Sequence, residues 1–397
     1  MREIYLQLTS SGTNANKYYH MIPVDDLCWK AEYGRVGAKP QVRGYPASAF
    51  DKKLREKLAK GYTDVTELHA RVPEKSAASF KEIADKSVKD LVDFLLARQK
   101  RALQENYVIE SGAVTEAMVE EAERYIALLR SARSTVVFNG YLEALFRALP
   151  RRMSKVGDYL AKSPSQFQEI IDREQALLDI MKSRVSQDHS KVDPDRTILE
   201  YYGLDMRPCT QEEIEEVKGV LGESKGLFYK AWKVTDRKRE EAFRKCCEEM
   251  GISKKLLLCH GSRTENWLSI LVNGLILRPN AVITGKLFGK GLYFARKAKK
   301  SIGYTSLEDA YWTGGHSAYG FLGIMEVGYG TPLHVRDDAS CWGHMTGKIL
   351  KRDYPGKSCL HAHAGANMGH SRLRNDEIVI YREDQCHIKY LVELKAR

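Results

Sequence analysis

The residues best suited to chemistry are concentrated between Leu258 and Tyr304. The run from His260 to Arg263 places an imidazole, a hydroxyl and a guanidinium around one glycine, whose backbone a ligand can approach closely. A second run, Phe288 to Gly291, leads into the aromatic Tyr293. Polar and aromatic side chains at strand and turn ends are typical of ligand sites, so this stretch predicts a nucleotide pocket.

Three elements must position these groups. The apolar run Leu256–Cys259 predicts a strand that ends at His260. A helix is predicted from Trp267 to Gly274, because apolar residues recur there at helical spacing and the glycine favours a stop. The run Leu292–Ala295 predicts a second strand.

Taken one at a time, these residues also have plain structural explanations. A lone histidine such as His260 more often has a structural role than a catalytic one. Phe288–Ala295 fits an ordinary strand and the turn before it, and Asp376-Glu377 fits the solvated start of an apolar strand. Residue types alone leave both interpretations open.

The composition is that of a globular protein with a basic surface. The 397 residues suffice for two or three domains, and 43% of them are apolar. No membrane-spanning run or signal-peptide pattern is present, so a soluble, intracellular protein is expected. The eight cysteines include no CxxC pair, which predicts reduced thiols. The net charge of +11 is compatible with a polyanionic partner or with a solvated basic surface.

The first 75 residues alternate short strand-like runs with turns. A helix is predicted from about Ser48, with Phe50, Leu54 and Leu58 on its apolar face. The predicted strands are Tyr5–Leu8, Lys17–Met21 and Cys28–Tyr33.

Aromatic residues such as Trp29 and Tyr33 lie among many cations in this region. Cations and stacking planes together suit contacts to phosphates and exposed bases. A merely basic domain is the alternative, and composition does not separate the two. The basic residues are Lys30, Arg35, Lys39, Arg43, Lys52, Lys53, Arg55, Lys57 and Lys60.

The run Glu32–Gly37, followed by Phe50–Lys53 and Lys60–Tyr62, resembles the WGR domain. That family is named for a Trp-Gly-Arg motif, and Tyr33 stands here at the Trp position, which keeps an aromatic plane and loses the indole N–H. The resemblance implies binding to DNA ends or breaks, with Tyr33 and Arg35 nearest the nucleic acid. The expected DNA-binding residues are Trp29, Lys30, Tyr33, Arg35 and Arg43.

From about residue 80 to Val185 the pattern turns helical. Ser87 with Asp90 predicts a capped helix start, Thr115 a second and Ser163-Pro164 a third. No titratable groups recur at catalytic spacing, so the apolar stripes predict a helical bundle without chemistry of its own.

Beyond the polar run Ser186–Pro194 the chain becomes strand-rich. It has no alternating strand–helix pattern, no Gly-x-Gly-x-x-Gly after a strand and no Walker A motif, which disfavours a Rossmann or P-loop fold. An α+β half with an antiparallel sheet core is expected. The strands predicted outside the pocket are Leu227–Val234, Gly323–Val327, Glu377–Tyr381 and Ile388–Val392.

Four sequence pieces match one family in order and spacing. They are HGSR…NW…IL…GL from His260, TG…FGKGLYFA from Thr284, KS…Y from Lys300 and NDEIVIY…KYL from Asn375. Together they resemble the catalytic domain of the poly(ADP-ribose) polymerases, from about Thr197 to the end.

The whole domain order resembles the DNA-dependent members of that family that lack N-terminal zinc fingers. It implies an α+β multidomain chain with a small β-rich WGR domain at 1–75 and an all-α helical regulatory, autoinhibitory domain at 80–190. Residues 195–397 would form an α+β ADP-ribosyltransferase domain with an antiparallel sheet core.

The resemblance implies a His-Tyr-Glu catalytic site made of His260, Tyr293 and Glu377. NAD⁺ carries a cationic nicotinamide leaving group, and breaking its glycosidic bond builds positive charge on the ribose. Glu377 near that sugar can bond a ribose hydroxyl, stabilise the charge and orient an acceptor hydroxyl. His260 would hold the adenine-side ribose. A glutamate at this position, instead of an apolar residue, favours polymer formation.

The same resemblance implies a nicotinamide subsite. Tyr293 and Tyr304 would stack on the two faces of the ring, and the Gly261 backbone would grip the carboxamide with help from the Ser301 hydroxyl. The expected NAD⁺-binding residues are His260, Gly261, Ser262, Tyr293, Lys300, Ser301 and Tyr304. On the acceptor side, Lys286 and Leu287 depart from the residues of the best-known members.

The function implied is a DNA-break-activated NAD⁺ ADP-ribosyltransferase that makes poly(ADP-ribose) on itself and other proteins in the DNA damage response. The protein would be nuclear in a eukaryote, otherwise cytoplasmic, and not secreted. A mono-ADP-ribosyltransferase and a catalytically silent DNA-end scaffold are the alternatives. No metal is expected, because His361, His363 and His370 lack Cys₂His₂-type spacing and fall in a predicted Gly-rich loop.

Overall fold

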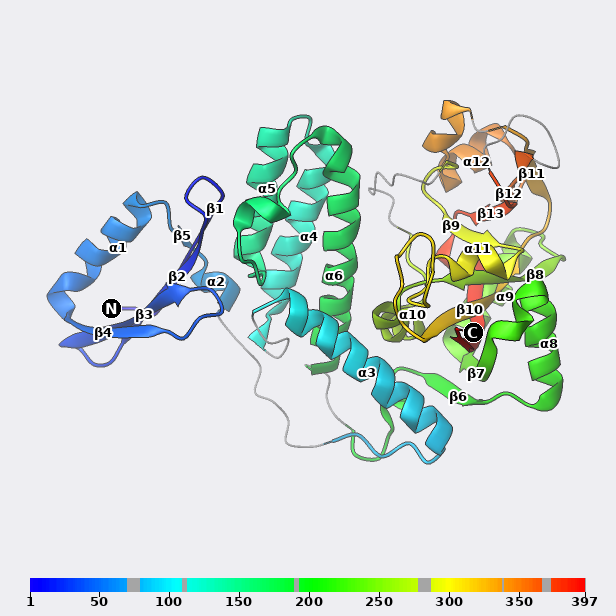
Figure 1. Ribbon diagram of the computed structural model, residues 1–397, viewed down its shortest axis with the longest axis horizontal. Coiled ribbons are helices and arrows are strands. Elements are labelled where there is room, and N and C mark those ends of the chain that lie inside the picture. The colour runs from blue at the N-terminus through cyan, green and yellow to red at the C-terminus, as the bar shows by residue number, and fades with distance from the viewer. Residues whose placement is uncertain are drawn as a thin grey trace. The chain divides into compact units, whose positions relative to one another are not determined.

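The computed structural model describes residues 1–69, 79–108, 113–188, 193–277, 287–337, 339–365 and 373–396. The chain forms two compact units, one of Met1–Ser76 with Lys100–Lys191 and the other of Ala77–Gln99 with Val192–Arg397. The long helix α3 (Lys86–Asn106) contributes its first part to the second unit and its last residues to the first unit. Figure 1 shows the elements of both units.

The first unit begins with a five-stranded antiparallel sheet in the order β4-β3-β2-β1-β5. The strands are β1 (Ile4–Ser10), β2 (Ala15–Pro23), β3 (Cys28–Arg35), β4 (Gln41–Pro46) and β5 (Thr63–Asp64). Helix α1 (Phe50–Ala59) packs on the sheet through Phe50, as predicted, whereas Leu58 is 43% exposed and lies off its buried face. The short helix α2 (Thr66–His69) follows β5.

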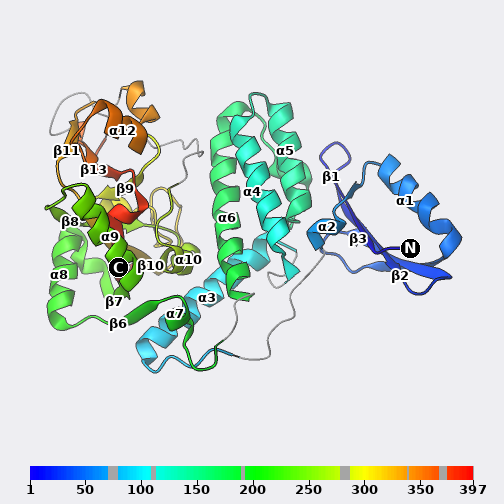
Figure 2. The same cartoon turned by 180° about the vertical axis from the view of Figure 1, so that it is seen from behind.

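The rest of the first unit is helical. Figure 2 shows α4 (Glu116–Ser131), α5 (Thr135–Ala148) and α6 (Phe167–Asp188) lying side by side. The predicted cap at Thr115 is confirmed, because its side chain accepts from the Met118 N–H. The cap predicted at Ser87 is wrong: Asp85 caps α3 at Val88, and Ser87 accepts a bond from the Trp232 indole.

The second unit is built on a nine-stranded sheet, counted over the described residues, in the order β11-β12-β13-β9-β8-β10-β14-β7-β6. Every pairing is antiparallel except that of β11 with β12. The strands are β6 (Leu204–Pro208), β7 (Phe228–Asp236), β8 (Lys255–Gly261), β9 (Leu292–Ala295), β10 (Tyr319–Gly328), β11 (Pro332–Val335), β12 (Cys359–Ala362), β13 (Glu377–Ile380) and β14 (Cys386–Lys395). The helices are α7 (Ile198–Tyr201), α8 (Gln211–Leu221), α9 (Arg237–Glu249), α10 (Trp267–Asn273), α11 (Ala298–Ile302) and α12 (Gly347–Asp353). The predicted α+β class with an antiparallel sheet core is confirmed.

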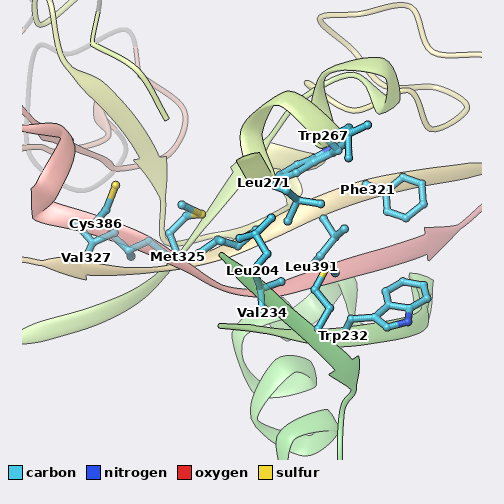
Figure 3. Packing of buried hydrophobic residues seen from close by; sticks show 14 of the residues in the cluster. Leu204, Trp232, Val234, Trp267, Leu271, Phe321, Met325, Val327, Cys386 and Leu391 are labelled. Atoms are coloured by element: carbon cyan, nitrogen blue, oxygen red, sulfur yellow. The ribbon is translucent and has the colours of Figure 1, made fainter. Parts of the chain in front are cut away.

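The core of the second unit joins α10 and α3 to the sheet. Figure 3 shows Trp267 and Leu271 of α10 close to Phe321 and Leu391 of the central strands. The first part of α3 belongs to the same core through Val88, Leu91, Val92 and Leu95. The first part of α3, which was predicted to belong to the helical domain, therefore contributes to the hydrophobic core that stabilises the sheet.

The predicted domain limits, 75/80 and 190/195, stay a prediction. The sheet of the first unit and the helices that follow it have separate hydrophobic cores, which is compatible with two domains inside that unit. Helix α3 departs from the predicted limits. It was expected in the helical domain at 80–190, but its residues 86–99 group with the second unit.

All eight cysteines are free thiols, as predicted. Among the residues that the structure describes, no helix is both long enough and apolar enough to cross a bilayer.

Candidate active site

The large sheet opens between β8 and β9. These two strands share a single residue pair, Cys259 with Ala295, whereas β9 continues alongside β13 over its whole length. Ala295 in turn pairs with Glu377, and His260 is the residue after Cys259. With neighbouring strands about 4.8 Å apart, the Cα atoms of His260 and Glu377 lie roughly 10 Å apart, on two strands separated by β9.

Glu377 is the most exceptional group at this opening. It begins β13, is 8% exposed, and pairs through Oε1 with the Lys300 ammonium of α11. Its second carboxylate oxygen, Oε2, is buried and has no hydrogen-bond partner among the described residues. Buried polar atoms are normally bonded, so an orphaned carboxylate oxygen is suited to receive a hydroxyl from a bound molecule.

His260 and Tyr293 are held in place by backbone atoms of this region. His260 Nδ1 lies 3.2 Å from the Tyr293 carbonyl oxygen, which ties β8 to β9 beside their single residue pair. The Tyr293 hydroxyl donates to the Gly289 carbonyl at 2.9 Å and accepts from the Phe288 N–H at 3.0 Å. Burial raises the pKa of the Tyr293 phenol, so it stays protonated and can keep donating. The ring is therefore preorganised before any ligand arrives.

Gly261 and Ser301 are in close backbone contact. A Cβ at Gly261 would lie 1.8 Å from the Ser301 carbonyl oxygen, so only glycine fits there. The buried Ser301 hydroxyl donates to the Cys259 carbonyl at 2.8 Å. Because the hydroxyl proton is already donated to this carbonyl, the Ser301 oxygen would accept a hydrogen bond from a ligand and would not donate one.

Gly261→Ala tests this contact. The new methyl group must push α11, with Lys300, away from β8, and we expect a cost of about 1–3 kcal/mol in stability or in NAD⁺ affinity. Melting temperature and the KM for NAD⁺ measure the two effects. Gly219→Ala in α8 is the matched control, because nothing lies within 4 Å of its added Cβ. A normal KM and melting temperature for Gly261→Ala would contradict the close packing.

Tyr304 closes one side of the opening. Its N–H donates to the Ser301 carbonyl at 3.0 Å, and its side chain is 40% exposed; burial, followed by the charge of Glu377, raises the pKa of its phenol. Its ring stacks on Trp312 at a centroid distance of 5.8 Å. We did not predict Trp312 from the sequence, although its position in a Thr/Gly loop and its 61% exposure are typical of a binding aromatic.

Ser262 has a local partner of its own. Its hydroxyl accepts from the Asn266 side-chain amide at 3.0 Å, and its carbonyl accepts from the Trp267 indole at 3.2 Å. These bonds anchor α10 to the end of β8. Lys286, predicted on the acceptor side, lies outside the described residues, whereas Leu287 packs in a core with Phe288.

The five predicted DNA-binding residues differ in their exposure and in their partners within the protein. Trp29 is 1% exposed and donates its indole N–H to Pro46, so it belongs to the core of the small sheet and its predicted DNA contact is wrong. Tyr33 stacks on Tyr19, and Lys30 pairs with Glu32 on the same strand.

The other two predicted cations have different environments. Arg35 donates to the Ser154 carbonyl at 2.6 Å and to the Asn14 carbonyl at 3.1 Å, so it fastens the small sheet to the helical part of its unit. Arg43 is exposed on β4, with its guanidinium 5.3 Å from the centre of the Tyr45 ring. Arg43 is thus the member of the predicted set most open to a polyanion.

Comparisons with known proteins agree with this architecture. The family description "Poly(ADP-ribose) polymerase catalytic domain" matches residues 211–338, and "WGR domain" matches residues 2–68. "Putative poly [ADP-ribose] polymerase-like 100L" of Invertebrate iridescent virus 6 is 30% identical over 194 residues, 46% of this chain and 96% of the viral protein. Poly [ADP-ribose] polymerase 2 of Zea mays is 29% identical over 174 residues, 40% of this chain and 26% of the maize protein.

Human poly [ADP-ribose] polymerase 2 is 48% identical over 66 residues, which are 16% of this chain and 10% of the human protein. The chain thus matches only a minor part of the plant and human proteins but nearly all of the viral one. NAD⁺ is the substrate of the matched catalytic domain, and the family indicates no metal cofactor. The chain therefore belongs to the poly(ADP-ribose) polymerase family, with that family's NAD⁺-dependent ADP-ribosyltransferase domain following a WGR domain.

Proposed function

We propose that this protein is a DNA-break-activated NAD⁺ ADP-ribosyltransferase that builds poly(ADP-ribose) on itself and on other proteins. The observation that carries the proposal is Glu377, a buried carboxylate at the sheet opening with one oxygen on Lys300 and the other without a partner. Such an oxygen suits a hydroxyl of the NAD⁺ ribose or of an acceptor.

The reaction breaks the glycosidic bond between the ribose and nicotinamide, whose ring nitrogen takes the bonding electron pair. An acceptor oxygen or other nucleophile forms the new bond at the same ribose carbon and gives up its proton. The ribose carries positive charge in between, as in glycosidases. The fixed negative charge of Glu377 stabilises that charge without reorganisation, and its free oxygen can orient an acceptor hydroxyl.

The other site residues position NAD⁺. Tyr293 and Tyr304 are the proposed stacking faces for nicotinamide, with Trp312 supporting Tyr304 from behind. The backbone of Gly261 grips the carboxamide. His260, tied to the β9 backbone, holds the adenine-side ribose. Because nicotinamide is already an activated leaving group, fixed orientation supplies much of the rate.

Polymer formation is the part of the proposal that separates it from single ADP-ribose transfer. A carboxylate that can align a ribose hydroxyl as the next acceptor favours chain extension. Labelled NAD⁺ followed by gel electrophoresis decides the matter: a ladder or smear supports the polymer, and a single shifted band supports mono-ADP-ribosylation.

DNA dependence is proposed from the WGR domain and from the exposed Arg43 beside the half-buried Lys53, which pairs with Glu56. Arg43 and Lys53 flank the Tyr45 ring, at 5.3 and 5.8 Å from its centre, and β4 is largely exposed. Cations around an aromatic plane suit a phosphate backbone with an unstacked base. NAD⁺ consumption with and without nicked DNA tests this, and no nicotinamide release with nicked DNA would favour the silent scaffold. In a eukaryotic host such a protein would act in the nucleus.

The helical region is proposed to restrain activity until DNA is bound. Deletion of residues 100–188 should raise DNA-free NAD⁺ turnover by about tenfold or more, because it removes α4, α5 and α6. The deletion must start after Gln99, since Val88, Leu91 and Leu95 of α3 are part of the catalytic core. Unchanged DNA-free turnover in a variant of normal melting temperature would show that these helices do not inhibit.

A further inference from the structure

Three histidines lie on one face of the strand pair β11 and β12. The two strands run parallel, and their register places His334 directly opposite His361. His363 lies two residues after His361 and continues the pairing, since its N–H donates to the Val335 carbonyl at 2.8 Å. Residues that are opposite, or two apart along a strand, project to the same face, so the backbone brings all three imidazoles together.

Asp376 joins the same face from the next strand. β12 pairs antiparallel with β13, with His361 opposite Ile378 and Ala362 opposite Glu377. Extending that register by one residue sets Asp376 beside His363. Because alternate residues point to opposite faces, Asp376 and Glu377 project to opposite sides of the sheet. The histidine cluster therefore lies on the opposite face of the sheet from the Glu377 carboxylate.

The imidazoles are close enough to share one ion. One ring nitrogen from each lies within 4.8 Å of the others, and His334 Nδ1 is 2.8 Å from His363 Nε2. Nitrogens that bind a tetrahedral zinc ion lie roughly 3.3 Å apart, given Zn–N bonds of about 2.05 Å. Side-chain shifts on the order of 1 Å would bring the three ring nitrogens from their present distances to those of a zinc site.

The surroundings fit a metal centre. Asp376 Oδ2 is 3.2 Å from His361 Nε2 and 3.8 Å from His363 Nδ1, and its other oxygen accepts from the Ala364 N–H. His361 Nδ1 lies 2.7 Å from the Tyr329 hydroxyl, which fixes the ring so that Nε2 faces the cluster. Metal-binding histidines commonly have such an outer partner on their second nitrogen.

We propose that His334, His361 and His363 bind one zinc ion, beside Asp376, which is hydrogen-bonded to His361. Three imidazoles match the ligand preferences of zinc, and a water molecule or a small shift of the Asp376 carboxylate would supply the fourth ligand of a tetrahedral site. The ion would fasten the edge strand β11 to β12. The sequence prediction of no metal considered His370, which lies outside the described residues, and missed His334, which comes from a separate strand. His361 itself lies in β12 and not in the predicted loop.

The test is metal content and stability of the full chain, made without a histidine tag and measured in the absence of NAD⁺ and DNA. We expect about one zinc per chain after gel filtration, and a fall in melting temperature when a strong chelator removes it. Cobalt in place of zinc should give the intense visible absorption of a four-coordinate site.

His334→Gln is the decisive variant, because His334 is exposed and its replacement should leave the fold intact. It should lose the zinc, the cobalt spectrum and the chelator effect. His344→Gln, at another exposed histidine of the same unit, is the control and should keep all three. Equal zinc content in His334→Gln and the native protein, or no zinc in the native protein, would overturn the proposal and leave a hydrogen-bonded imidazole cluster. None of these three readouts depends on the proposed enzyme function.

Discussion

Replacing Glu377 with Gln is expected to lower ADP-ribose polymer formation by on the order of 10²–10³-fold while NAD⁺ still binds. The amide keeps the shape of the carboxylate, so contacts to bound NAD⁺ change little. The lost negative charge acts mainly on the positively charged ribose of the transition state, so kcat falls far more than KM rises. NAD⁺ titration and the labelled-product gel measure the two quantities separately.

The control for this variant is Glu326→Gln. Glu326 lies on β10 of the same sheet and pairs with His387 at 3.0 Å, outside the opening between β8 and β9. It should support normal polymer formation. Full-length polymer from Glu377→Gln would show that another group stabilises the reacting ribose. Loss of NAD⁺ binding together with a lower melting temperature would show instead that the Glu377–Lys300 pair is structural.

Much of the candidate site could be located in the sequence because its parts carry strong local signals. His260 lies at the end of a recognisable apolar strand, one residue before Gly261, and Gly274 caps α10 with a φ of 71°, as its position predicted. Glu377 comes from the far end of the chain, and only the family resemblance linked it to His260. The structure supplies the physical link, the row of paired residues from Cys259 through Ala295 to Glu377.

The sequence interpretation fails where contacts between residues far apart in the chain determine the local structure or the burial of a side chain. Helix α5 was not predicted, because its start, Thr135-Val136-Val137, is β-branched and favours a strand locally. Trp29 was interpreted as a DNA contact because composition alone does not tell which face of a strand is buried. In the structure Trp29 and Ala31, two residues apart on β3, both point into the core. His334 was missed because nothing near it in the sequence marks β11 as the parallel partner of β12.

Arg151 is the other residue for which the sequence carries no signal. Its guanidinium donates to Glu174 at 2.9 Å and to the Asn106 side chain at 3.0 Å, and it lies 4.9 Å from the centre of the Tyr107 ring. The side chains of Arg151 and Glu174 are both 2% exposed. Asn16 of the small sheet donates to the Arg151 carbonyl at 3.2 Å, so the pair lies where sheet and helices of the first unit meet.

Arg151→Met is expected to destabilise the first unit by about 3–5 kcal/mol, because it leaves the Glu174 carboxylate buried without its main partner. The double variant Arg151→Met/Glu174→Leu should recover most of that loss, since it removes both charges and retains apolar volume. Urea unfolding of the full chain measures both. Lys182→Met breaks the exposed pair with Glu123 on neighbouring helices and should cost within about 1 kcal/mol.

Arg151→Met is expected to affect the function of the first unit and not that of the second. The buried pair belongs to the first unit, whereas the residues of the proposed NAD⁺ site all lie in the second. Arg151→Met should therefore abolish the proposed stimulation by nicked DNA and leave NAD⁺ binding to the catalytic domain intact, because it loosens the connection between the WGR domain and the helices. The double variant, with its packing restored, should regain stimulation. Normal stimulation in a destabilised Arg151→Met protein would mean that the DNA signal does not pass through the junction of sheet and helices.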